Sequence, residues 1–148
     1  MMKGDLVFVK SSAPLSADEI CKSSVRTDAD INSIASSDDK SVAIMVWNYH
    51  DDDLSASPSN ISINIKNITE RRVQVTHYRI DDQYSNSYEM WKAMGEPQNP
   101  SPDQLKILER SGQLQMYSSP VWKNVINGNI IVDFSLPRQG VSLIKLTW

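Results

Sequence analysis

Helix signals are concentrated in one stretch of this chain, residues 86–112, and strand patterns lie on both sides of it. Asn86 is a suitable N-cap, Glu89 stands at the position of its capping-box partner, and Gly95 is suited to end the helix that they begin. The apolar stripe of this helix consists of Tyr88, Met90, Trp91 and Met94. The sequence therefore predicts a short helix placed within a chain of strands.

A second short helix is predicted directly after this one. Ser101 is a capping residue, Pro102 occupies the first turn, and Gln104 is the reciprocal capping partner. Its apolar residues are Leu105, Ile107 and Leu108, and Gly112 is its predicted stop. Together the two helices form a helical insertion at about residues 85–112 of a mostly β chain.

The strongest strand pattern is Ser41–Tyr49, in which apolar residues are contiguous from Val42 to Trp47. Such a run is typical of a strand that is covered on both faces. Residues 60–66 instead alternate apolar and polar side chains, which predicts a strand with one face in water. The apolar positions of Val73–Ile80 change phase halfway, as a β-bulge in that strand would produce.

Further short strands are predicted from apolar runs bounded by turn residues. They are Leu6–Lys10, Ala29–Ala35, Leu114–Tyr117, Ile130–Phe134 and Val141–Trp148. Pro120 is expected to separate two of them, and Asn127-Gly128 is typical of a hairpin turn. Seven or eight short strands predict a sandwich or a barrel, and we favour an antiparallel β-sandwich that forms one domain over residues 1–148.

Composition excludes several classes of function. The chain has 15 basic and 18 acidic residues, a net charge of -3 and no basic run, so nucleic acid is not an expected partner. Neither a stretch of about 18 apolar residues nor a signal peptide is visible, so we expect a soluble chain without a membrane partner. Cys21 is the only cysteine, and the compartment stays undetermined.

Three motifs carry a resemblance to a known family. They are VWNYHDDD at 46–53, HYRID at 77–81 and SNSYEMWKAMGEPQNPSPDQ at 85–104. In this order they resemble the region that follows the catalytic barrel in glycoside hydrolase family 39, which contains β-xylosidases and α-L-iduronidases. The resemblance covers roughly residues 4–148 and departs at Tyr84, where family members often have histidine. It implies a β-sandwich without the (β/α)8 barrel that performs retaining hydrolysis of xylosides.

No catalytic residues, cofactor or metal ligands are predicted in this chain. Glycoside hydrolysis requires two carboxylates across a sugar cleft, and the five glutamates lie in turns or on helical faces. Asp81-Asp82 is interpreted as a solvated strand end or a cap for the following turn rather than an acid/base pair. Asp51–Asp53 is interpreted as a solvated loop rather than a Ca²⁺ site. His50 and His77 are interpreted as hydrogen-bonded structural residues rather than zinc ligands.

The resemblance and the aromatic residues give two hypotheses of function. The first is a non-catalytic accessory domain of a β-xylosidase-like enzyme, inactive alone, that docks on the barrel or self-associates through Tyr88, Trp91 and Met94. The second is an independent carbohydrate-binding module, in which an exposed Trp122 contacts sugar. Trp47 and Trp91 are expected to pack in the core, since both lie among apolar residues.

Overall fold

The structure is a computed structural model that describes residues 2–12, 14–26, 28–52 and 54–148. The described residues form eight strands and three short helices. The strands are β1 (Asp5–Val7), β2 (Asp30–Asp38), β3 (Ser41–Tyr49), β4 (Ser59–Ile65), β5 (Arg72–Ile80), β6 (Gln115–Asn124), β7 (Ile130–Leu136) and β8 (Gly140–Thr147). The helices are α1 (Ala17–Ser23), α2 (Ser87–Ala93) and α3 (Pro102–Ser111). The predicted mostly β fold with a two-helix insertion is confirmed.

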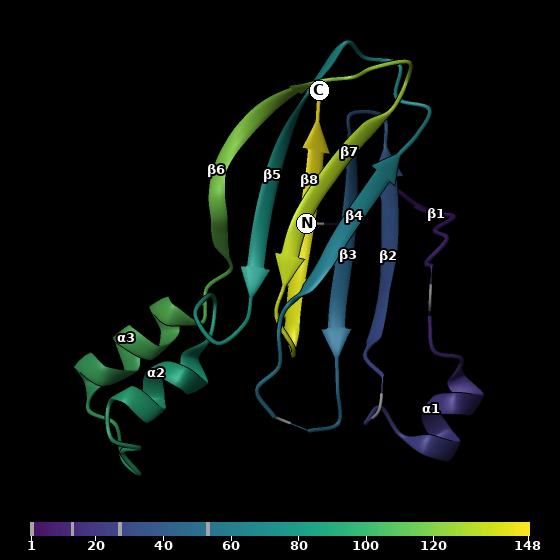
Figure 1. The fold of residues 1–148 in the computed structure, drawn as a ribbon. Coiled ribbons are helices and arrows are strands. Elements are labelled where there is room, and N and C mark those ends of the chain that lie inside the picture. Colours follow the sequence, from purple (N-terminus) through teal and green to yellow (C-terminus); the bar gives the residue numbers. More distant parts are fainter. Residues whose placement is uncertain (1, 13, 27, 53) are drawn as a thin grey trace.

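The strands form two antiparallel sheets of unequal width. Six strands pair in the order β1-β2-β3-β8-β5-β6, and β4 pairs with β7. Figure 1 shows β4 and β7 crossing one face of the larger sheet. The architecture is therefore an open sandwich rather than a closed barrel. None of the helices among the described residues is long and apolar enough to cross a membrane.

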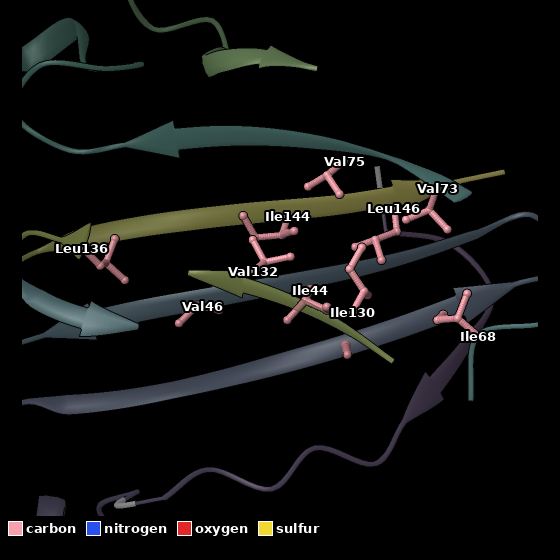
Figure 2. Packing of buried hydrophobic residues seen from close by; sticks show 11 residues of the cluster. Ile44, Val46, Ile68, Val73, Val75, Ile130, Val132, Leu136, Ile144 and Leu146 are labelled. Carbon is pink, nitrogen blue, oxygen red and sulfur yellow. The ribbon is translucent and has the colours of Figure 1, made fainter. Parts of the chain in front are cut away.

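The hydrophobic core lies between the two sheets. Strand alternation supplies it, because inward positions of β4 and β7 are apolar while their outward neighbours are mostly polar. The buried members of the core are Ala35, Ile44, Val46, Ile68, Val73, Val75, Ile130, Val132, Leu136, Ile144 and Leu146, most of which are labelled in Figure 2. Burial of one such aliphatic side chain stabilises a fold by roughly 1.5–3 kcal/mol.

Coverage of β3 differs from the prediction. Ile44 and Val46 face the core, whereas Trp47 lies on the outer face of the six-stranded sheet and is only half-buried. The two-stranded sheet covers only the inner face of β3 and not its outer face. The expectation that Trp47 packs in the core is therefore wrong, although its apolar strand is present as predicted.

The predicted bulge belongs to a different strand. Register between β5 and β8 is continuous, while register between β5 and β6 shifts on both sides of His77. The partner residue changes from Val121 to Ser118 between Val75 and His77, and from Ser118 to Met116 between His77 and Tyr78, so β6 has one additional residue at each shift. β5 itself alternates without interruption, and its apparent change of phase arises because two polar residues, His77 and Arg79, face the core.

Two turn residues have different places from those predicted. Pro120 lies within β6 and does not end it; an edge strand tolerates proline because one side of its backbone is unpaired. Asn127 and Gly128 both have positive φ, as the predicted turn requires. The turn, however, joins β6 to β7 across the two sheets, and it closes only a bridge between Ile126 and Asn129.

Candidate functional site

Two polar side chains of β5 lie inside the sandwich. His77 and Arg79 continue the inward alternation that begins with Val73 and Val75, and Arg79 is only 2% exposed. A buried cation requires compensation, because transfer of a charge out of water is costly. Uninterrupted alternation from Val73 and Val75 is the sequence signal that places His77 and Arg79 on the inward side of β5. The predicted bulge would instead have turned both side chains outward.

The Arg79 guanidinium is held by three elements. Its Nη2 donates to the main-chain oxygen of Ser135 on β7 at 2.9 Å, and its Nη1 lies 3.4 Å from Oδ2 of Asp81. Its Cζ lies 4.3 Å from the ring centre of Tyr117 on β6, which is a cation–π contact. This residue therefore joins both sheets at the end of the sandwich from which the helical insertion departs.

His77 is buried beside Arg79. Its Nε2 lies 3.0 Å from Oγ of Ser142, and its ring contacts Tyr117 and Phe134. Burial, with a smaller contribution from the Arg79 charge, lowers the pKa of His77 to about 4. The imidazole is therefore neutral at neutral pH, and its interpretation as a hydrogen-bonded structural residue is confirmed.

We expect acid to destabilise the fold through His77. Between pH 6.5 and about 4 the unfolded chain binds a proton that the folded chain does not, so the contribution of neutral His77 is complete above pH 6.5 and is lost as pH falls through that range. The loss should be about 2 kcal/mol after allowance for partial solvation. Urea denaturation at pH 7 and pH 4.5 measures it. The loss of stability between pH 7 and pH 4.5 should be smaller in His77→Gln than in the unsubstituted chain, and it should be unchanged in His50→Gln. Equal losses in the unsubstituted chain and both variants would contradict the assignment of the acid sensitivity to His77.

Asp81 organises the loop between β5 and α2. Its Oδ1 accepts hydrogen bonds from the backbone N–H groups of Gln83 and Tyr84, each at 2.9 Å. The Asn86 side chain donates to the Asp81 main-chain oxygen at 2.9 Å and also caps α2. Ser85 Oγ donates to the carbonyl of Arg79. The interpretation of Asp81 as a turn cap is confirmed, and through this loop the helical insertion is attached to the buried arginine.

The helices α2 and α3 form a hairpin that projects from the end of the sandwich (Figure 1). Their predicted caps Asn86 and Ser101 are confirmed, and so is the reciprocal bond from Gln104. The carboxylate of Glu89, the predicted capping partner of Asn86, pairs with Lys92. Neither helix contains a buried residue. Tyr88 is 61% exposed, and its ring stacks on that of Trp91 at 5.8 Å.

Trp91 and Met94 are half-buried, and both lie within the hairpin rather than in the core. The indole Nε1 of Trp91 donates to the carbonyl oxygen of Pro97 at 3.1 Å, which fixes the ring against the turn between the helices. The expectation that Trp91 packs in the core of the sandwich is therefore wrong. The structure brings Tyr88 and Trp91 together on a hairpin that the sandwich does not cover.

Trp122 stands apart from these residues. It lies on the edge strand β6 rather than in a turn, it is 55% exposed, and the guanidinium of Arg72 lies 5.5 Å from its ring centre. An exposed indole can stack on the apolar face of a sugar, but here a cation lies against the ring.

The acidic loop after β3 is held by hydrogen bonds and an ion pair. Asp51 accepts from the N–H of Val25 at 2.6 Å, and Asp52 pairs with Arg138 at 2.7 Å. Arg138 also lies 2.6 Å from Nδ1 of His50. Asp53 lies outside the described residues. Within the described ranges, no three His, Cys, Asp or Glu side chains are grouped as a metal site would require.

These features define an open β-sandwich with an attached helical hairpin and a buried arginine at the junction. No family model matches the chain. Several solved glycoside hydrolases contain a region with the same fold. A GH39 enzyme from Xanthomonas axonopodis pv. citri aligns over 78% of this chain with a TM-score of 0.69 and 15% identity.

Two further solved structures give the same result. A monomeric β-xylosidase from Caulobacter crescentus aligns over 78% of this chain with a TM-score of 0.67 and 17% identity. A bacterial orthologue of human α-L-iduronidase aligns over 80% with a TM-score of 0.67 and 16% identity. The chain spans only 22–26% of the length of these proteins. The resemblance to one region of family 39 enzymes is therefore confirmed at the level of the fold.

Proposed function

We propose that this chain is a non-catalytic accessory domain of a β-xylosidase-like family 39 glycoside hydrolase. The chemistry, retaining hydrolysis of xylosides, belongs to a (β/α)8 barrel, and the sandwich supports that barrel. The fold match to about a quarter of each glycoside hydrolase favours this role. The helical hairpin, with Tyr88, Trp91 and Met94, is the proposed contact with the barrel.

The observation that carries the proposal is the lack of any buried residue in α2 and α3. Helices of seven and ten residues are shorter than the roughly 12–15 residues at which isolated helices become even marginally stable in water. Most helical stability in proteins comes from packing of an apolar face. The hairpin displays such a face, with Leu105 and Ile107 each almost half exposed. A neighbouring domain would complete its packing.

The alternative function, a carbohydrate-binding module, is favoured by the exposure of Trp122. Tryptophan fluorescence measured during titration of the purified chain with xylo-oligosaccharides distinguishes the two functions. For an accessory domain we expect no saturable change up to about 10 mM, which corresponds to binding weaker than roughly 3 kcal/mol. Saturable binding that Trp122→Ala abolishes would establish the carbohydrate-binding function instead.

A second assay tests the absence of catalysis. The purified chain should release no nitrophenol from nitrophenyl β-D-xyloside, because a pair of carboxylates across a sugar cleft is required for that reaction. Release that persists through purification and is abolished by a single carboxylate substitution would make the chain an enzyme in its own right, and would overturn the proposal.

A further inference from the structure

The outer face of the six-stranded sheet carries an apolar row that crosses five strands. Backbone register pairs Ile34 with Met45, Met45 with Leu143, Leu143 with Tyr78, and Tyr78 with Met116. Residues paired in this way lie side by side on one face of a sheet. At a spacing of about 4.8 Å per strand, the row is about 19 Å long.

A second apolar row lies beside the first. Trp47 pairs with Val141, and Val141 pairs with Ile80, two residues further along each strand. We call these eight side chains the outer apolar face: Ile34, Met45, Trp47, Tyr78, Ile80, Met116, Val141 and Leu143. The central members are half-buried by their neighbours, while Ile34, Ile80 and Met116 at its margins are 38–52% exposed.

The two outer surfaces of the sandwich differ in character. The outward residues of β4 and β7 are mostly polar, as expected of a surface in water: Asn60, Ser62, Asn64, Asp133 and Ser135, with Ile131 as the exception. On the larger sheet, the contiguous apolar run of β3 predicted cover on both faces. The chain supplies that cover on the inner face, where Ile44 and Val46 lie in the core. The outer face of the larger sheet therefore carries apolar residues of the kind that are typical of a covered surface.

An unsatisfied acceptor lies at the margin of this face. Asp30 accepts from Nε1 of Trp47 at 2.8 Å through Oδ2, and its Oδ1 is buried without a hydrogen-bond partner among the residues that the structure describes. Both residues line a hollow of about 190 Å³ together with Tyr49, Gln139 and Val141. An unpaired buried carboxylate oxygen is costly, so a donor from a neighbouring molecule would stabilise it.

We propose that the outer apolar face is a second docking surface for the catalytic barrel, distinct from the helical hairpin. This inference rests on the proposed function. A (β/α)8 barrel has an outer ring of helices, and helices packed on the face of a sheet form one of the common layer arrangements of proteins. The occupant is such a helical layer, which presents apolar side chains to the two rows and a hydrogen-bond donor to Asp30.

The size of the face favours a domain of the same polypeptide over a second copy of this chain. The first row is about 19 Å long, and the second row, about 7 Å from it, crosses three strands and is about 10 Å long. An outward residue of a sheet occupies roughly 4.8 Å by 6.6 Å, so the eight side chains give a footprint on the order of 250 Å². Stable association of separate proteins buries about 800 Å² on each partner. A covalently attached domain has a high effective concentration, so a smaller patch suffices, and the nearby helical hairpin adds to the contact. Ile80 and Met116 lie on the strands that lead into and out of that hairpin.

Hydroxyl-radical footprinting tests the proposal, because Met45, Trp47, Tyr78 and Met116 are readily oxidised. The chain is compared alone and as a chimera, in which it replaces the matching quarter of the monomeric Caulobacter crescentus β-xylosidase. In the chimera, we expect Met45 and Trp47 to be oxidised roughly five-fold more slowly, because the core of an interface excludes solvent. Trp122, on the edge strand, should be oxidised equally in both.

Residues of the helical hairpin separate failure of this inference from failure of the proposed function. Protection of Tyr88 and Trp91 without protection of Met45 would overturn the second docking surface alone. Protection of neither group, or a chimera that yields no folded enzyme, would overturn both proposals. Protection of Met45 that increases with concentration in the isolated chain would identify a second copy as the occupant, and would also overturn the inference.

Matched substitutions complete the test. Leu143→Lys in the centre of the outer apolar face should remove the protection of Met45 in the chimera. Ile131→Lys, which makes the same change on the outward side of β7, should leave it intact. Ile34→Lys at the margin provides a second variant if Leu143→Lys prevents folding. Protection of Met45 that survives in folded Leu143→Lys or folded Ile34→Lys protein would contradict the proposal.

Discussion

Replacement of Arg79 by alanine should lower the free energy of unfolding by about 3–5 kcal/mol. The substitution leaves the Asp81 carboxylate and the Ser135 carbonyl without their buried cation, and it removes the side chain that packs on Tyr117. Stability of most domains is only about 5–15 kcal/mol, so this variant should be close to the limit of folding at 37 °C. Urea denaturation followed by circular dichroism at pH 7 measures the change.

A less disruptive pair of substitutions separates charge from volume. Arg79→Met retains most of the side-chain volume, so it should be less destabilising than Arg79→Ala. Addition of Asp81→Asn to Arg79→Met should cost less than the sum of the two single effects, because the carboxylate that lost its cation is then neutral. Strict additivity would show that the 3.4 Å contact between Arg79 and Asp81 contributes nothing to stability.

The second large effect is expected in the apolar core. Ile144 on β8 is fully buried, and in register it lies between Ile44 and His77. Truncation to alanine should lower the free energy of unfolding by about 2–5 kcal/mol, from lost burial and from the cavity that remains. Thermal and urea denaturation both report this loss.

Ile131 provides the matched control for Ile144. It is the same residue type on β7, but it points outward and is 52% exposed. Ile131→Ala should change the free energy of unfolding by less than about 1 kcal/mol, because surface substitutions away from special features have small effects. Similar losses in the two variants would mean that the core does not lie between the sheets as described.

Sequence reasoning located the helical hairpin well because its signals are local. A capping serine followed three residues later by glutamine, and a proline at the first turn, act within one turn of helix, and the structure contains all of them at Ser101–Gln104. The alternation of residues 60–66 likewise placed three isoleucines on one face of β4. Both patterns depend on residues close together in the chain, so they can be recognised without knowledge of the fold.

The same reasoning did not find the interior position of Arg79. A charged residue is usually exposed, so the polar residues His77 and Arg79 give β5 the apparent change of phase that predicts a bulge. In the structure, compensation for the buried charge comes from Tyr117 and Ser135, which lie 38 and 56 residues away in the chain. No pattern within β5 records those partners.

What the sequence by itself determined is most of the elements: strands from alternation and apolar runs, two capped helices from residues 86–112, and the turn at Asn127-Gly128. The tertiary structure decided which faces those elements share. It placed His77 and Arg79 between the sheets, Trp47 outside them, and eight apolar side chains in two rows on an outer face. The physical reason is that periodicity fixes the side of a strand on which a residue lies, whereas burial depends on what packs against that side.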